Sequence, residues 1–182
     1  MTTRVSVHVE PRSPIAMARH YIRDLVYGAN DGIITTFAVV AGVAGGELSA
    51  TAAVVVGAAN LAADGLSMGV GNFLAIRAHE SARQADNLPE EEAHPWKHGF
   101  ATFAAFVAAG VVPLIPYVTT VPSQRVFATS CVLTLIALFG VGALRGAVTT
   151  DPWWRAGLEM LVLGLMVAAA AYGAGALAAW AV

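Results

Sequence analysis

Two aspartates stand inside stretches of sequence that are otherwise apolar. Asp31 lies in GANDGII, residues 28–34, and Asp64 lies in NLAADGLSMGVGN, residues 60–72. A charged side chain at the centre of a bilayer costs about 2.5–3.5 kcal/mol on insertion scales, so such residues are rare and usually functional. The two acids are therefore the first candidates for chemistry. The alternative for either acid is a protonated carboxyl group that only bonds to its neighbours.

The neighbours of Asp64 repeat at every fourth position and form a polar stripe of Asn60, Asp64, Met68 and Asn72. Side chains at this spacing lie on one face of a helix. Oxygen ligands combined with a thioether suit a first-row ion such as Fe²⁺ or Mn²⁺ better than Ca²⁺. The structural alternative is that Met68 only fills space and that Asn60 only bridges helices.

The segments that carry these residues are predicted to cross a membrane as helices. The chain of 182 residues is 57% hydrophobic and 12% charged, whereas a globular domain carries roughly 25% charged residues. A hydrocarbon core of about 30 Å needs about 20 helical residues, and the alternating strands of a barrel are absent from the sequence. We expect an all-α bundle of five transmembrane helices, approximately Leu25–Ala44, Thr51–Ala75, Phe100–Val118, Val126–Leu144 and Ala156–Val182.

The basic residues predict the orientation of this bundle. Nine of the ten precede the first span, follow the second or flank the connection between the fourth and fifth, and only Arg125 falls on the other side. The positive-inside rule then places the N-terminus in the cytosol and the C-terminus outside. We expect residues 1–20 to form a cytosolic tail, residues 21–182 the transmembrane domain, and residues 76–98 a cytosolic loop within it.

Counting along the spans places the two acids at one depth. Asp31 lies 13 residues before Ala44 and Asp64 lies 13 residues after Thr51, on spans that run in opposite directions. At a rise of about 1.5 Å per residue, both acids lie about 20 Å from the outer face. Thr35, one turn beyond Asp31, and Asn72 are further candidate oxygen donors.

Small residues and prolines predict how the helices pack and end. Pairs of the GxxxG type let helix backbones approach closely in lipid, and an odd number of spans in so small a chain favours a homo-oligomer. Pro113 and Pro116 would kink or end the third span. The four glycine pairs are Gly28 and Gly32, Gly42 and Gly46, Gly65 and Gly69, and Gly142 and Gly146.

Several classes of function are disfavoured by the sequence. The net charge of −2 and the absence of a basic stripe argue against nucleic acid as a partner. No nucleophile and base pair, HExxH motif or phosphate-binding glycine loop occurs, so no enzyme activity and no resident cofactor are expected. The single cysteine, Cys131, excludes a disulfide within the chain.

Three segments resemble the vacuolar iron transporter family, which includes the yeast calcium cross-complementer and nodulin-21-like proteins. They are RDLVYGANDGIITTFAVVAGVAGG, GAANLAADGLSMGVGNFLA and FGVGALRGAVTTDPWWRAGLEMLVLG, and the resemblance extends over residues 21–182. It implies a five-helix homodimer that moves Fe²⁺ or Mn²⁺ out of the cytosol in exchange for protons. It also implies a path at the dimer interface lined by an aspartate and a methionine, at positions that match Asp31 and Met68.

The sequence departs from the resembled family between the second and third spans. Many members carry a long helical insert there, rich in glutamates that collect metal, whereas this connection covers only residues 76–98. It is either a solvated loop in which PEEE opens a short helix or a weak cytosolic metal-gathering site. Its acidic and histidine side chains are Glu80, Asp86, Glu90, Glu91, Glu92, His79, His94 and His98.

Two acids near the cytosolic side are candidates for guiding ions towards the path. Glu80 lies in the connection just described. Glu159 lies a few residues inside the fifth span, where snorkelling or pairing with Arg155, four residues earlier, offers a structural alternative.

The sequence leaves the cargo and the membrane open. Carboxylate and thioether ligands do not discriminate sharply between Fe²⁺ or Mn²⁺ and Zn²⁺, Co²⁺ or Ni²⁺. A metal-sensing or scaffold subunit that transports nothing is a further alternative. The alanine-rich composition and the absence of a recognisable targeting peptide favour a prokaryotic plasma membrane.

Overall fold

The structure, a computed structural model, describes residues 6–181, and these residues are almost entirely helical. Five of the helices are long and apolar enough to cross a membrane, which confirms the predicted all-α class and the five spans. Arg4 and Val182, which the sequence analysis used, lie outside the described residues. The elements are α1 (Pro14–His20), α2 (Ile22–Gly45), α3 (Ala50–Ala85), α4 (Pro95–Gly110), the 3₁₀ helix η1 (Val112–Tyr117), α5 (Ser123–Val148) and α6 (Trp153–Ala181).

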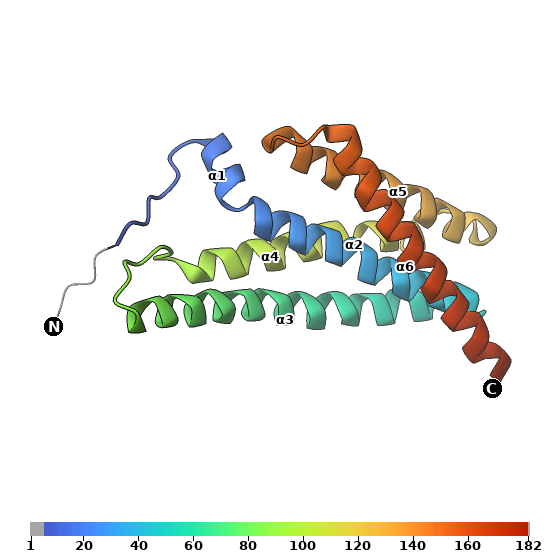
Figure 1. Cartoon of the computed structure of the whole chain (residues 1–182). Helices are drawn as coiled ribbons and strands as arrows, with labels where there is room; N and C mark the ends of the chain where they lie inside the picture. Colours follow the sequence, from blue (N-terminus) through green and yellow to red (C-terminus); the bar gives the residue numbers. More distant parts are fainter. Residues whose placement is uncertain (1–5, 182) are drawn as a thin grey trace.

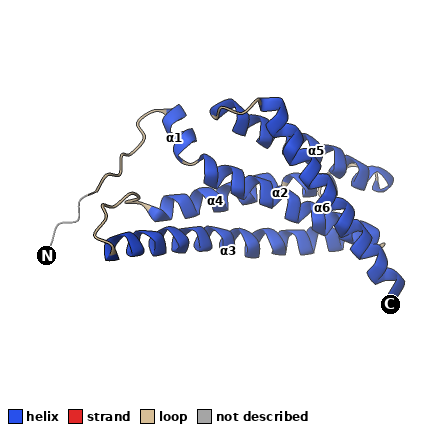
Figure 2. Cartoon of the chain, in the orientation of Figure 1, coloured by secondary structure: helices blue, strands red, loops and turns tan. Residues whose placement is uncertain are grey.

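Helix α2 is the centre of the bundle. It packs most extensively on α4 and α6, and α3 lies along α4 on the side away from α6 (Figures 1 and 2). α5 and α6 form a second antiparallel pair that crosses the first helices obliquely. The apolar core lies where α2, α3, α4 and η1 meet, and consists of Phe37, Val40, Leu61, Phe106 and Leu114.

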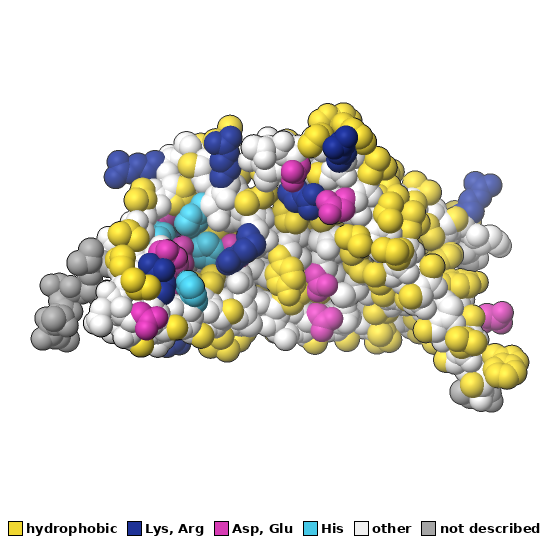
Figure 3. Space-filling model, in the orientation of Figure 1, with side chains coloured by type: hydrophobic (Ala, Val, Ile, Leu, Met, Phe, Trp, Pro, Cys, Tyr) yellow, Lys and Arg dark blue, Asp and Glu magenta, His cyan; other side chains and the backbone are white. Residues whose placement is uncertain are grey.

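The long helices of the bundle expose many large apolar side chains. Only 11% of the most apolar window of α6 is buried, and large side chains such as Leu177 and Val162 are exposed. Lysines, arginines and histidines gather where α2, α4 and α6 begin and α3 ends (Figure 3). We call this the basic end of the bundle. Exposed apolar surface on this scale requires an apolar solvent such as lipid.

Helix α3 is longer than the sequence analysis predicted. Its 36 residues span about 54 Å at a rise of about 1.5 Å per residue, which exceeds a hydrocarbon core of about 30 Å. Residues 76–85 therefore continue the helix, and the predicted loop at 76–98 is wrong over this half. The connection to α4 covers only residues 86–94.

The acidic run PEEE does not open a helix, so that prediction is also wrong. Residues 89–94 are irregular, and α4 begins at Pro95. Proline favours the first helical position because its missing N–H would be unpaired there. The Pro95 ring also disfavours helical geometry for the residue before it, His94. The helix therefore does not extend back to the three glutamates, which stay in the connection.

The N-terminal tail folds back along this connection. Ser13 caps α1, its hydroxyl accepting a hydrogen bond from the Ala16 N–H at 3.2 Å. Further upstream, the Val7 N–H donates to the Glu90 carbonyl at 2.8 Å, and Lys97 pairs with Glu10. The tail is thus held against the start of α4.

Two prolines end the third span as predicted. α4 stops at Gly110, and the chain continues as the 3₁₀ helix η1, which contains Pro113 and Pro116. The Ser130 hydroxyl of α5 donates to the Pro113 carbonyl at 2.7 Å. This bond satisfies a backbone acceptor that proline disturbs in a regular helix.

The close contact of α2 with α4 depends on glycine, and this leads to a testable prediction. A Cβ atom at Gly28 would lie 2.3 Å from the Thr102 carbonyl oxygen, whereas a Cβ atom at Gly71 would meet nothing within 4 Å. We expect Gly28→Ala to destabilise the fold by about 1–3 kcal/mol through overpacking. Gly71→Ala is the matched control and should gain up to about 1 kcal/mol from helix propensity.

Thermal unfolding of the two variants in detergent measures this difference. Equal midpoints for Gly28→Ala and Gly71→Ala would contradict the close packing of α2 on α4.

Candidate functional site

The two aspartates predicted to lie level inside the bilayer interact electrostatically. Asp31 comes from α2 and Asp64 from α3, and both side chains are half-buried. Asp64 is the charged group whose electrostatic field reaches the Asp31 carboxyl. The structure thus places these two carboxyl groups, from different helices, within range of a direct electrostatic interaction.

Met68 and Asn60 lie one turn on either side of Asp64 along α3. Met68 is half-buried and packs against the apolar core. The Nδ2 atom of Asn60 is buried with no hydrogen-bond partner among the described residues. The stripe therefore presents a thioether on one side of the carboxyl pair and an unsatisfied amide on the other.

Thr35 and Asn72, the two additional oxygen donors proposed from the sequence, lie in different surroundings. The Thr35 hydroxyl donates to the Asp31 carbonyl at 2.8 Å, so Thr35 stays beside the carboxyl pair. Asn72 is committed elsewhere, because its Nδ2 donates to Asp24 Oδ1 and to Thr102 Oγ1, each at 2.8 Å. The structure places Asn72 in a second polar centre.

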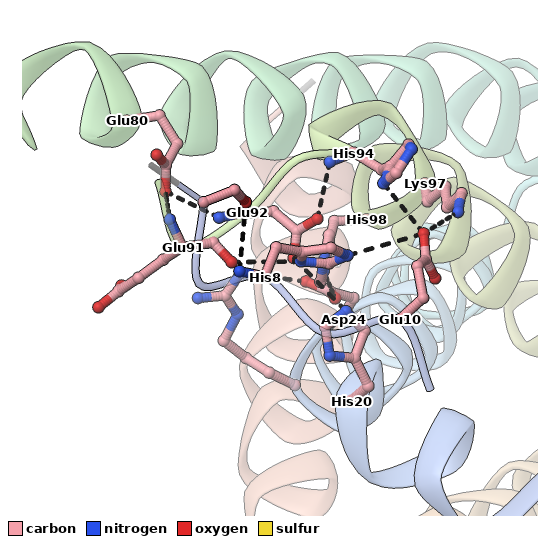
Figure 4. Close-up of polar contacts among 12 residues, drawn as sticks. His8, Glu10, His20, Asp24, Glu80, Glu91, Glu92, His94, Lys97 and His98 are labelled. Atoms are coloured by element: carbon pink, nitrogen blue, oxygen red, sulfur yellow. Dashed lines mark hydrogen bonds and ion pairs between the residues drawn. The ribbon is translucent and has the colours of Figure 1, made fainter. Parts of the chain in front are cut away.

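This second polar centre is buried at the basic end. Asp24 of α2 is 1% exposed and His98 of α4 is 6% exposed, and His98 Nδ1 lies 2.5 Å from Asp24 Oδ2. The other ring nitrogen, Nε2, lies 2.9 Å from Glu92 Oε2 (Figure 4). The imidazole therefore connects an acid inside the bundle to an acid in the α3–α4 connection.

Glu92 and Glu80 hold the α3–α4 connection in place through hydrogen bonds. Burial favours the neutral form of Glu92, but hydrogen bonds from the His94 N–H and from His98 outweigh it and lower the pKa of this carboxyl. Glu80 is buried, and its Oε1 accepts from the backbone N–H groups of Glu91 and Glu92 at 3.2 and 3.0 Å. Glu80, a predicted ion-guiding acid, thus anchors the connection onto α3.

Glu159 has a partner other than the one predicted. Its Oε2 lies 2.6 Å from Arg145 Nη2 at the end of α5, whereas Arg155 stacks over the Trp154 ring at 5.0 Å. The predicted pairing with Arg155 is therefore wrong. The reason is the tight α5–α6 pair, which brings Arg145 beside the first turns of α6.

Asp24, His8 and His20 were not predicted as site residues from the sequence. Asp24 lies just before the predicted start of the first span, and the two histidines lie in a segment treated only as a tail. The available signal was the spacing of His20 to Asp24 and of His94 to His98, four residues in each case. Spacing of this kind puts side chains on one helical face.

A model of the VIT family matches residues 22–93 and 80–176. The chain belongs to the VIT family. The two matched segments cover α2 to α5 and α6 up to residue 176, and they include both Asp31 and Asp64. The resemblance drawn from the sequence motifs is thereby confirmed.

The chain can be aligned with named VIT relatives over most of its own length and of theirs. The chain is 26% identical to "Vacuolar iron transporter 1" of Eucalyptus grandis over 213 residues, which cover 86% of each chain. It is 25% identical to "Vacuolar iron transporter 1" of Arabidopsis thaliana, over 93% of this chain and 94% of the relative. It is 30% identical to "Vacuolar iron transporter homolog 1" of Oryza sativa subsp. japonica, over 84% of this chain and 72% of the relative.

The comparison with these VIT relatives supports a location in a membrane and shows a difference in chain length. Family membership and five membrane-spanning helices make the protein an integral membrane protein, and the relatives bear the names of transporters. The aligned region with the Eucalyptus grandis relative is longer than the 182 residues of this chain. That relative therefore has additional residues within the aligned region.

Proposed function

We propose that the protein exports a divalent transition metal, Fe²⁺ or Mn²⁺, from the cytosol in exchange for protons. The observation that carries this proposal is the pair of carboxyl groups, Asp31 and Asp64, which come from two helices and interact electrostatically inside a bundle of a metal-transporter family. Adjacent carboxylates repel each other, and either a proton or a divalent cation relieves that repulsion. The pair is therefore suited to exchanging one for the other.

Membrane orientation follows from the positions of the charges. Basic side chains gather at one end of the bundle (Figure 3), and the positive-inside rule assigns that end to the cytosol. The N-terminus is then inside and the C-terminus outside. A prokaryotic plasma membrane is the location we favour.

A second copy of the chain completes the path in this proposal. Asn60, Asp64 and Met68 are only half-buried in the single chain, so part of each side chain is exposed on the surface of α3. Lipid is a poor solvent for such a stripe, whereas an identical stripe across a two-fold axis supplies matching ligands. The ion then passes between the two copies, with Met68 favouring softer metals over Ca²⁺ and Mg²⁺.

Exchange proceeds in three steps. Metal from the cytosol displaces protons from Asp31 and Asp64, moves past them with Met68 and Thr35 as additional ligands, and leaves on the far side. Protons, more abundant on the far side, bind the carboxylates as the ion leaves and so drive its release. Metal binding and loss of protons are coupled, because either the metal ion or the protons must compensate the negative charge of the two carboxylates.

Transport into proteoliposomes tests this function. Purified protein is reconstituted with an acidic lumen and a metal-sensitive dye, and uptake of Mn²⁺ or Fe²⁺ should exceed that of protein-free vesicles and collapse when the pH gradient is removed. Competition by Zn²⁺, Co²⁺ or Ni²⁺ identifies a different cargo. No uptake of any of these ions would instead favour a metal-sensing or scaffold subunit and overturn the proposal.

A further inference from the structure

Three imidazoles and one carboxylate converge at the basic end, outside the carboxyl pair. Glu92 Oε2 lies 2.9 Å from His98 Nε2, 3.4 Å from His20 Nε2 and 3.5 Å from His8 Nδ1. The four side chains come from the tail, α1, the α3–α4 connection and α4 (Figure 4). We call this set the histidine cluster.

The histidine cluster is sheltered and incompletely hydrogen-bonded. The side chains of His8 and His98 are each 7% exposed, and that of Glu92 is 14% exposed. The Nε2 atom of His20, which faces Glu92, is buried with no hydrogen-bond partner among the described residues, whereas His8 Nδ1 also lies 3.2 Å from the Glu91 carbonyl oxygen. Buried polar atoms of this kind are rare unless water, an ion or a ligand satisfies them.

The spacing of the cluster fits an ion. The ligand atoms of His20, Glu92 and His98 all lie within 4.8 Å of one another. An ion that holds nitrogen and oxygen ligands tetrahedrally at about 2.0–2.2 Å separates them by about 3.4 Å. The separations of His20 and His8 from Glu92 already match that value. His20, Glu92 and His98 also line a hollow of about 420 Å³.

Asp24 supplies the outer support that metal-bound histidines usually have. A ligating imidazole almost always donates its second N–H to a carboxylate or carbonyl, which fixes the ring and leaves the other nitrogen free for the metal. His98 Nδ1 faces Asp24 Oδ2 at 2.5 Å, and Asn72 holds the same carboxyl at 2.8 Å. When a metal replaces the proton shared by His98 Nε2 and Glu92, the Nδ1–H bond to Asp24 leaves the Nε2 lone pair facing the cluster.

We propose that the histidine cluster is a second metal site, in which His20, Glu92 and His98 bind a divalent transition metal and His8 closes it as a fourth ligand. A nitrogen-rich set with one carboxylate suits Zn²⁺, Co²⁺, Ni²⁺ or Fe²⁺ rather than Ca²⁺ or Mg²⁺. Two ligands come from the N-terminal segment, so binding also fastens the tail to the bundle. Its role as a loading site for export rests on the proposed function, whereas binding itself does not.

Cobalt titration of the full-length, metal-stripped protein in detergent tests the site. Tetrahedral Co²⁺ with histidine ligands absorbs visible light, so the spectrum reports this site directly. We expect His20→Ala and His98→Ala to weaken Co²⁺ binding by about 10- to 100-fold or more, and Asp24→Asn by about 10- to 100-fold. His79→Ala is the matched control, because this histidine is 63% exposed and outside the cluster.

Cobalt binding that is unchanged in both His20→Ala and His98→Ala would overturn the site. His20 is one quarter exposed, so His20→Ala keeps the test decisive if His98→Ala does not fold. A second readout is trypsin cleavage after Arg12, which is exposed and lies between His8 and His20. Co²⁺ should slow this cleavage in the parent protein and in His79→Ala, but not in His20→Ala. If Co²⁺ does not change the cleavage rate of the parent protein, the tail is not fastened by metal binding.

The variant Asp31→Asn separates this inference from the proposed function. Cobalt binding that persists in Asp31→Asn and disappears in His20→Ala supports the histidine cluster by itself. Binding that disappears only in Asp31→Asn overturns the cluster and leaves transport standing. A parent protein that binds Co²⁺ at the cluster but transports nothing overturns the proposed function alone.

Discussion

Replacing Asp31 with asparagine is expected to reduce metal transport to the level of protein-free vesicles. Asparagine keeps the size of the side chain but can neither carry negative charge nor release a proton. The variant should fold, because the Asp31 carboxylate has no ion-pair partner among the described residues that the change would remove. Its loss of function would therefore report on the chemistry of the carboxyl group.

The measurement is dye-detected Mn²⁺ uptake into acidic proteoliposomes, with each variant reconstituted at equal density. Asp86→Asn is the matched control, since Asp86 is an exposed acid in the α3–α4 connection and should transport like the parent. Asp64→Asn should also lose transport, because the exchange requires two carboxyl groups that repel each other. Undiminished uptake by Asp31→Asn would remove the central residue of the proposed path.

The spans were predictable because lipid imposes one simple condition on the sequence. Each crossing segment must satisfy its own backbone hydrogen bonds and be apolar over about 20 residues. Hydropathy alone therefore located all five long helices. The equal depth of Asp31 and Asp64 was predicted by counting residues, because helix rise is nearly constant, and in the structure Asp64 acts electrostatically on the Asp31 carboxyl.

The polar stripe on α3 shows the limit of reasoning from a helical face. Asn60 and Asn72 share that face, but they are separated by about 18 Å along the axis at about 1.5 Å per residue. One ion cannot touch both ends of such a stripe. Asn72 instead meets Asp24 and Thr102, a choice set by the packing of α2 and α4 that no periodicity in α3 reveals.

Only half of the histidine cluster was predictable, because Glu92 and His98 lie in the connection considered from the sequence as a metal-gathering site, whereas His8 and His20 lie in the tail. His8, His20, Glu92 and His98 are spread over 91 positions of the sequence, and no motif links them. They meet because the tail reverses onto the connection through the Val7 to Glu90 hydrogen bond and the Lys97 to Glu10 pair. The bond from Lys97 lowers the pKa of Glu10 against a smaller opposing effect of desolvation, so this contact is charged at neutral pH.

Asp24→Ala is expected to cause the largest loss of stability among single changes at the basic end. Asp24 is 1% exposed and accepts hydrogen bonds from His98 and Asn72. Removing one partner from a buried polar pair costs about 3–5 kcal/mol, because the remaining groups keep their desolvation penalty without compensation. For a chain of this size, each kcal/mol corresponds to about 2–4 °C in the unfolding midpoint.

Thermal unfolding in detergent with a metal chelator present measures this loss without a contribution from bound metal. Arg23→Ala is the control, since the Arg23 side chain is 71% exposed and 3.4 Å from the same carboxylate, and exposed pairs of this kind contribute at most about 1 kcal/mol. Asp24→Asn should fall between the two, because it keeps an oxygen acceptor and loses the charge. If Asp24→Ala unfolds at the same temperature as Arg23→Ala, the buried contact with His98 contributes nothing to the fold, and the ring orientation that the histidine cluster depends on would need another source.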